Sequence, residues 1–98
     1  HQAARAMALV RDGRAVFERE LPKLGVTVFP SAGNFVLADV GPSGQAVYEG
    51  LLKLGVIVRP VGGYGLARCV RITIGTGPQN ERLVQSLASV LRDRGVRR

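Results

Sequence analysis

The hydrophobic residues near the start of the chain recur every three or four positions. They are Ala6, Leu9, Val16, Phe17, Leu21 and Leu24. This spacing predicts one long amphipathic helix over residues 3–24. Pro22 falls in the last turn of this helix and interrupts it. Gly25 follows, and a glycine at that place can adopt the positive φ that ends many helices.

Two short segments rich in β-branched and aromatic residues come next. Residues 26–29 read Val-Thr-Val-Phe, and residues 34–39 read Asn-Phe-Val-Leu-Ala-Asp. The Pro-Ser-Ala-Gly sequence at 30–33 is typical of a turn. We therefore predict two strands that pair as neighbours.

A second helix is predicted after residue 42. Ser43 is a suitable N-cap, and Val47, Leu51 and Leu54 form the stripe that we expect to be buried. Residues 53–58 then repeat the lysine-leucine-glycine-valine pattern of residues 23–28. The repeat predicts the same arrangement, a helix that stops at a glycine and is followed by a strand.

The fourth predicted strand covers residues 69–74, after a glycine-rich loop at 61–66. Side chains alternate between the two faces of a strand. One face of this segment carries Val70, Ile72 and Ile74, which helices would cover, and the other carries Cys69, Arg71 and Thr73. We therefore expect the side chain of Arg71 to point away from the hydrophobic core.

The last predicted helix begins with a capping box. Thr76 and Gln79 have the required spacing, Pro78 lies in the first turn, and Leu83, Leu87 and Leu91 form a stripe. The element order is thus α-β-β-α-β-β-α. This order predicts an α+β fold, with a small, largely antiparallel sheet and helices on one face. Residues 1–98 are expected to form a single domain.

Composition restricts the class of protein further. Cys69 is the only cysteine, so neither an internal disulfide nor a cysteine-based metal site is expected. No apolar run reaches the roughly 20 residues of a membrane span, and the first fourteen residues lack the apolar core of a signal peptide. A cytoplasmic protein is the default expectation.

Because the chain opens at His1 inside a predicted helix, we expect it to be part of a longer polypeptide.

The net charge of +7 leaves more than one kind of partner open. Nucleic acids, phosphorylated metabolites and acidic surfaces would all be attracted by it. A small module that binds RNA or DNA through its sheet is therefore one hypothesis. Proteins that read RNA on a sheet stack bases on exposed aromatic residues, but the strand at 69–74 contains no aromatic residue. We therefore expect no nucleic acid as partner.

Two arginines are the strongest candidates for binding chemistry. Arg59 ends the predicted third strand, and Arg71 lies in the fourth, twelve residues later. A loop of this length can bring the two strands side by side, so the two guanidinium groups can converge on one carboxylate or phosphate. The alternative is that each arginine forms an ion pair with a surface carboxylate or binds a carbonyl at the sheet edge.

Other candidates have weaker support. The amide of Asn34 can orient a ligand or cap a turn, and Tyr64 can close over a ligand or pack on the sheet.

The only histidine is His1, so no serine-histidine or cysteine-histidine nucleophile can be built. Lys23 and Lys53 lie in the last turns of helices, where a cation stabilises the helix dipole. The chain by itself is expected to have no catalytic residue.

Several motifs together resemble the carboxy-terminal part of the histidinol-phosphate aminotransferase family. They are Pro-Ser-Ala-Gly-Asn-Phe at 30–35, Gly-Val-Ile-Val-Arg-Pro at 55–60, Tyr-Gly-Leu at 64–66, Val-Arg-Ile-Thr-Ile-Gly-Thr at 70–76, and Asn80. The resemblance covers nearly the whole chain. It implies the substrate-binding small domain of a fold-type I enzyme that uses pyridoxal phosphate, beside a large domain that holds the cofactor.

The resemblance also implies roles for the arginines. Arg71 would bind the α-carboxylate of the substrate or the phosphate of histidinol phosphate, and Arg59 would contact that phosphate or the side-chain carboxylate of glutamate. Asn34 and Tyr64 would complete the substrate-binding residues. The Schiff-base lysine and the other cofactor ligands belong to the large domain, so this chain should hold neither cofactor nor metal. The full-length enzyme would be a homodimer, and the isolated chain would be inactive.

A related chemistry remains open within the same group. Threonine-phosphate decarboxylase and other related enzymes share much of this region with the histidinol-phosphate enzymes. Because part of substrate selection depends on residues outside these 98, the sequence does not choose between them. The amino donor and acceptor therefore rest on the resemblance.

Overall fold

The computed structural model describes residues 2–30 and 33–93 and has the element order that the sequence predicts. His1, residues 31–32 of the predicted turn and the side chain of Ala6 lie outside this described part. The helices are α1 Gln2–Glu20, α2 Gly44–Lys53 and α3 Gly77–Asp93, and the strands are β1 Thr27–Phe29, β2 Phe35–Asp39, β3 Arg59–Val61 and β4 Leu66–Thr73. Short 3-10 helices cover Leu21–Leu24 and Gly62–Tyr64.

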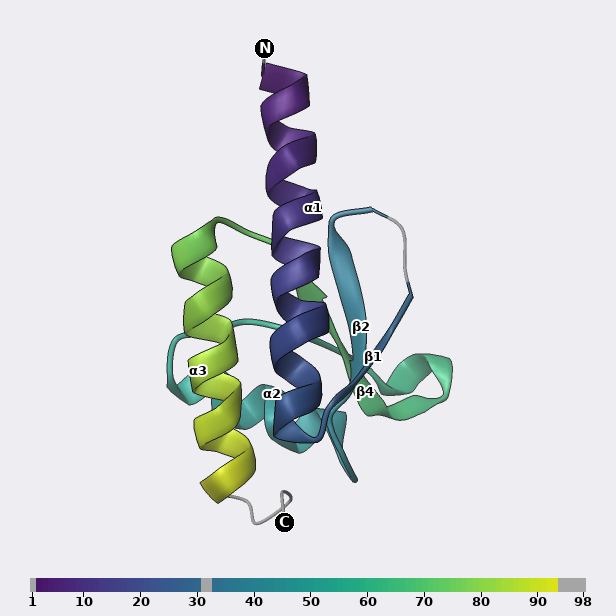
Figure 1. The fold of residues 1–98 in the computed structure, drawn as a ribbon. Coiled ribbons are helices and arrows are strands. Elements are labelled where there is room, and N and C mark those ends of the chain that lie inside the picture. Colours follow the sequence, from purple (N-terminus) through teal and green to yellow (C-terminus); the bar gives the residue numbers. More distant parts are fainter. Residues whose placement is uncertain (1, 31–32, 94–98) are drawn as a thin grey trace.

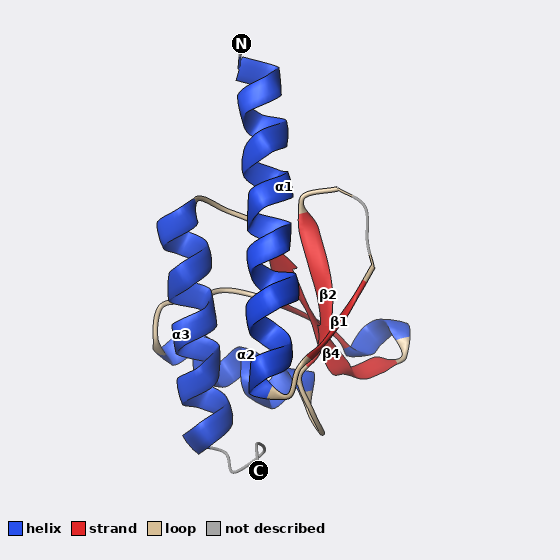
Figure 2. Ribbon diagram, in the orientation of Figure 1, coloured by secondary structure: helices blue, strands red, loops and turns tan. Residues whose placement is uncertain are grey.

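The four strands form one antiparallel sheet in the order β1-β2-β4-β3, with the helices gathered on one side of it (Figure 2). This confirms the predicted α+β class. The edge strand β3 contains Pro60, which lacks a backbone N–H and is tolerated where a strand has a neighbour on one side only.

One hydrophobic core lies between the helices and the sheet. Strands β2 and β4 contribute Val36, Ala38, Val70 and Ile72, all fully or almost fully buried. The helical side is formed mainly by Phe17, Leu21, Val47, Leu51, Leu83, Leu87, Val90 and Leu91. The alternation predicted for β4 is confirmed from Val70 to Thr73, because Val70 and Ile72 are buried whereas Thr73 is exposed. Cys69, predicted on the same face as Thr73, is buried as well.

The amino-terminal part of α1 extends beyond the rest of the fold (Figure 1). Met7 is 72% exposed and Leu9 is 46% exposed, although Leu9 belongs to the predicted hydrophobic stripe. Leu9 is exposed because the stripe continues past the point where the sheet and α3 end. Among the described residues, no helix combines the length and the apolar character needed to cross a membrane.

The end of the first helical segment follows the sequence prediction. Pro22 lies in a 3-10 turn, and Gly25 adopts a φ of 83°. The N–H of Gly25 donates to the carbonyl of Pro22 at 3.0 Å, which satisfies one of the carbonyls left free at a helix end. The chain then enters β1 after a single residue, Val26, which is buried.

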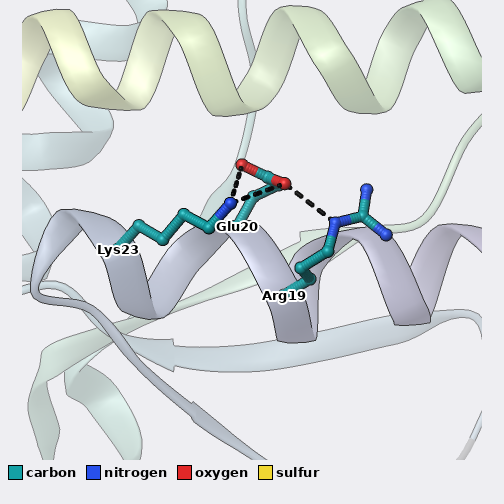
Figure 3. Close-up of polar contacts among 3 residues, drawn as sticks. All are labelled: Arg19, Glu20 and Lys23. Atoms are coloured by element: carbon teal, nitrogen blue, oxygen red, sulfur yellow. Dashed lines mark hydrogen bonds and ion pairs between the residues drawn. The ribbon is translucent and has the colours of Figure 1, made fainter.

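Glu20 forms ion pairs at this helix end. Its carboxylate accepts hydrogen bonds from Arg19 Nε at 2.8 Å and from Lys23 Nζ at 3.3 Å (Figure 3). The hydrogen bond from Arg19, followed by that from Lys23, lowers the pKa of Glu20 below its ordinary value. A carboxyl whose pKa is lower in the folded chain stabilises the fold above its unfolded pKa, and this contribution disappears as the pH falls through the folded pKa.

We therefore expect Glu20→Gln to lower the stability slightly at pH 7 and to have no effect at pH 2. The measurement is the urea midpoint of the wild-type chain and the variant at both pH values. The reason is that the ion pairs exist only while Glu20 is ionised. An equal difference at the two pH values would show that packing, rather than charge, accounts for the effect.

Helix α2 begins as predicted but ends earlier than its stripe suggests. Ser43 Oγ accepts a hydrogen bond from the N–H of Ala46 at 3.1 Å, which confirms the N-cap. Leu51 is fully buried, but Leu54 is 44% exposed, so the prediction that Leu54 is buried was wrong. The helix ends at Lys53, and Leu54 has left helical geometry, which turns its side chain away from the core.

The third strand begins later than its sequence pattern suggests. Residues 56–58 were predicted as a strand ending at Arg59, but β3 is Arg59–Val61 and Arg59 begins it. In the segment before β3, Val58 is buried whereas Ile57 is 76% exposed. Hydrophobic residues alone do not make this segment a strand, because backbone pairing with β4 begins only at Arg59.

The start of α3 is fixed by two sets of hydrogen bonds. The capping box is confirmed, because Gln79 N–H donates to Thr76 Oγ1 at 3.3 Å and Thr76 N–H donates to Gln79 Oε1 at 2.9 Å. Next to it, the buried amide of Asn80 bonds both backbone groups of Gly75, accepting from its N–H at 2.8 Å and donating to its carbonyl at 3.0 Å. The turn from β4 into α3 is thereby held at two points.

Gly13 allows α1 to lie close against this turn. A Cβ at position 13 would lie 2.3 Å from Ile74 Cγ2 and 2.7 Å from Asn80 Nδ2, closer than packed atoms can approach. We expect Gly13→Ala to destabilise the chain by about 1–3 kcal/mol, although alanine favours helix more than glycine by about 1 kcal/mol. Chemical denaturation of the 98-residue chain measures this difference.

Gly77→Ala is the matched control, because Gly77 also lies in a helix and nothing would lie within 4 Å of its added Cβ. That variant should be neutral or slightly more stable. Equal stability of the Gly13 and Gly77 variants would contradict the close approach of α1.

Candidate functional site

The sheet register brings the two candidate arginines together. In the antiparallel pair of β3 and β4, Arg59 lies directly opposite Arg71. Side chains that face each other in this way have Cβ atoms about 4.5–5.5 Å apart on one face of the sheet. The same row continues across the sheet to Leu37 and Phe29. The two guanidinium groups therefore project from neighbouring positions on the face away from the helices.

The environments of the two arginines differ. Arg71 is half-buried, with its Cζ 5.2 Å from the centre of the Phe35 ring, whereas Arg59 is exposed at the sheet edge. Among the described residues, neither guanidinium forms an ion pair with a carboxylate or a hydrogen bond with a carbonyl. The described part of the chain therefore does not supply the ion pairs that were the alternative explanation of these arginines.

A hollow of about 330 Å³ lies beside the pair, around the edge of β3. It is lined by Tyr48, Ile57, Val58, Arg59, Pro60, Arg71 and Thr73. Pockets for small ligands begin at about this size. None of the lining residues is acidic, so the charge of the hollow is positive and suits an anion with several oxygen atoms.

Neither Asn34 nor Tyr64 lines the hollow. Asn34 is exposed just before β2, and its carbonyl accepts a hydrogen bond from the N–H of Ile74 at 2.7 Å. Tyr64 is 82% exposed in the 3-10 turn at the tip of the β3–β4 hairpin. Leu66, at the start of β4, pairs with Val61, two residues from Arg59, because the register shifts between Pro60 and Val61. The role of Tyr64 in substrate binding therefore stays a prediction.

Of the residues that line the hollow, sequence identified only Arg59 and Arg71 as site residues, and it missed Tyr48, Thr73 and the neighbouring Phe35. Thr73 shares a face with Arg71 and lines the hollow, and the ring of Phe35 lies against the Arg71 guanidinium. Phe35 resembled an ordinary strand residue because its contact with Arg71 depends on which strand pairs with β2. The alternation in 69–74 placed Thr73 on the correct face, but it did not indicate the hollow.

Cys69 and Asp39 lie further along the same strands. Burial raises the pKa of the Cys69 thiol, and the nearby Asp39 carboxylate adds to this effect. Asp39 accepts a hydrogen bond from Arg68 at 3.1 Å and one from the N–H of Gly41 at 3.0 Å. A buried cysteine with a raised pKa is a poor nucleophile. In the described part of the chain, no group of three or more His, Cys, Asp or Glu side chains is placed to hold a metal ion.

Comparison with known proteins identifies relatives over most of the chain. Residues 5–87 match the family model described as aminotransferase class I and II. A histidinol-phosphate aminotransferase of Anaeromyxobacter sp. (strain Fw109-5) is 46% identical over 89 residues, which cover 90% of this chain. The same alignment covers 24% of that relative, so the chain spans about a quarter of the length of the curated relatives it matches.

Solved structures have the same fold as this chain. The histidinol-phosphate aminotransferase of Clostridium acetobutylicum matches with a TM-score of 0.83 and 28% identity, covering 92% of this chain and 28% of that one. The corresponding enzyme of Sinorhizobium meliloti, solved in complex with pyridoxal-5'-phosphate, matches with a TM-score of 0.84 and 26% identity. The latter match covers 92% of this chain and 26% of that one.

Proposed function

The chain belongs to the aminotransferase class I and II family, and on this basis we propose that it is the substrate-binding small domain of a longer aminotransferase. The reaction proposed for the whole protein is amino transfer between histidinol phosphate and 2-oxoglutarate, which gives imidazole-acetol phosphate and glutamate. Relatives carrying the histidinol-phosphate aminotransferase name support this choice of substrates. The whole protein is proposed to act in the cytoplasm as a homodimer.

The observation that carries the proposal is the arginine pair beside an open hollow. Arg59 and Arg71 lie opposite each other, and no described carboxylate neutralises them. A phosphate group has enough oxygen atoms to accept hydrogen bonds from both guanidinium groups at once. The side-chain carboxylate of glutamate can use the same donors, so one pair of arginines serves both substrates in turn.

The other two candidates have secondary roles in this proposal. Asn34 is bonded through its backbone carbonyl to Ile74, just after β4, and is proposed to help orient the substrate. Tyr64 is exposed in the turn between β3 and β4, and we propose that it contacts the substrate from there.

Enzymes of this family depend on pyridoxal phosphate, but the described residues do not fit that cofactor. Lys23 is exposed and paired with Glu20, and Lys53 is exposed at the end of α2. Neither lysine lines the hollow at Arg59 and Arg71, so neither is placed beside a substrate held there. We propose that the cofactor is held by the part of the polypeptide that this chain lacks, and that the isolated chain is inactive.

The test is an assay of the full-length protein that contains this chain, purified with pyridoxal phosphate. We expect 2-oxoglutarate-dependent consumption of histidinol phosphate and formation of glutamate. Threonine phosphate, offered in parallel, distinguishes the related decarboxylase chemistry because that reaction releases carbon dioxide. Turnover of threonine phosphate without turnover of histidinol phosphate would overturn the proposed reaction while leaving the family assignment intact.

A further inference from the structure

Phe35 and Arg71 contact each other because of the register of β2 and β4. Phe35 lies opposite Thr73, which is two positions beyond Arg71 on the same face. Diagonal neighbours of this kind are within reach of an aromatic ring and a long side chain. The guanidinium carbon of Arg71 accordingly lies 5.2 Å from the centre of the Phe35 ring. This distance is within the range of a cation–π interaction.

Such a contact holds the guanidinium group without using its hydrogen-bond donors. The N–H groups of a guanidinium lie in its plane, and a stacked ring contacts the face of that plane. Arg59 lies directly opposite and carries the same charge, so the two side chains repel each other when no anion is bound. A contact that keeps Arg71 in place against this repulsion prepares the pair for an anion.

The backbone of Phe35 is itself anchored from the helical layer. Arg14, on α1, donates from Nη1 to the carbonyl of Phe35 at 3.3 Å, and its Nη2 donates to the carbonyl of Gly33. On the other side, Phe35 pairs with Thr73 in the sheet. The ring therefore projects from a segment that is held on two sides.

We propose that Phe35 is a positioning residue, whose ring holds the Arg71 guanidinium beside Arg59 in the orientation that binds the substrate phosphate. This inference rests on the proposed function of the arginine pair and adds a residue that acts through Arg71. Phe35 itself need not contact the anion. Its contribution is to reduce the number of orientations that Arg71 must give up on binding.

The test is an NMR titration of the isotope-labelled 98-residue chain with inorganic phosphate. In the wild-type chain, we expect the side-chain protons of Arg71 to be shifted upfield by the Phe35 ring, and phosphate to perturb Arg59 and Arg71 together. Phe35→Leu should abolish the upfield shift and raise the Kd for phosphate roughly two- to fivefold. Phe35→Tyr retains an aromatic face and should preserve both values.

Phe29→Leu is the matched control, because Phe29 is a partly exposed phenylalanine on the same face, two strands away from Arg71. It should leave the Arg71 shift and the Kd unchanged. An equal Kd for the Phe35→Leu and Phe29→Leu variants would overturn the positioning role and leave the anion site intact. The absence of an upfield shift at Arg71 in the wild-type chain would have the same meaning. If the shift is present but phosphate perturbs neither arginine, the proposed anion site fails and the positioning role fails with it.

Discussion

If the full-length protein has the proposed activity, replacing Arg71 with alanine is expected to lower kcat/KM for histidinol phosphate by about a hundredfold or more. Each hydrogen bond to a charged group contributes about 1.5–3 kcal/mol, and a planar guanidinium can donate two to one phosphate. Steady-state kinetics with histidinol phosphate and 2-oxoglutarate measure the loss. Arg71→Lys should be intermediate, because lysine keeps the charge but lacks the planar pair of donors.

Arg68→Ala is the control for this experiment. Arg68 lies on the same strand, is exposed, and is paired with Asp39 rather than lining the hollow. Its removal should change kcat/KM by less than about twofold, since exposed ion pairs contribute little. Normal activity of the Arg71→Ala enzyme would overturn the role assigned to this arginine, and equal losses in the two variants would show a general effect of charge.

The largest loss of stability is expected from Asn80→Ala, at about 2–5 kcal/mol. Asn80 is 3% exposed, and its side chain bonds both the N–H and the carbonyl of Gly75. Alanine would leave these two half-buried backbone groups without their partner and would also remove the packing of the buried amide, and each unsatisfied group costs up to about 1–3 kcal/mol. Urea denaturation of the 98-residue chain measures the change.

Gln85→Ala is the control, because Gln85 is an exposed position of the same helix. Its stability should stay within about 0.5 kcal/mol of the wild-type chain. Combining Asn80→Ala with Gly13→Ala should cost less than the sum of the two single changes, since the Asn80 amide is one of the groups that an added Cβ at Gly13 would meet. Strict additivity would contradict this packing.

The sequence pattern predicted those features that depend on local spacing. Alternation in β4 separated buried Val70 from outward-facing Arg71, and the caps at Ser43 and Thr76 were found because their hydrogen bonds span only three residues. Helix ends at Gly25 and Gly55 were predicted for the same reason, since both glycines adopt a positive φ. Local chemistry was sufficient for each of these.

Features set by contacts between distant segments were missed. Leu54 fits the stripe of α2, but α2 ends one residue before it, and the Arg82 guanidinium from α3 donates to the Leu54 carbonyl at 2.7 Å. The start of β3 depends on where β4 pairs with it, and the contact of Phe35 with Arg71 depends on the β2–β4 register. Helical and strand periodicity carry no information about either pairing.

The direct pairing of Arg59 with Arg71 has a consequence for how this region tolerates insertions. Between the two arginines, the hairpin turns through Gly62–Tyr64, and a register irregularity lies between Pro60 and Val61. Extra residues at the hairpin tip would lengthen the turn without changing which residues face each other. One extra residue between Cys69 and Arg71, where β4 pairs with β2 residue by residue, would instead turn Arg71 toward the core. Among homologues, the length of the tip should therefore vary freely, whereas the number of residues from Cys69 to the arginine should not.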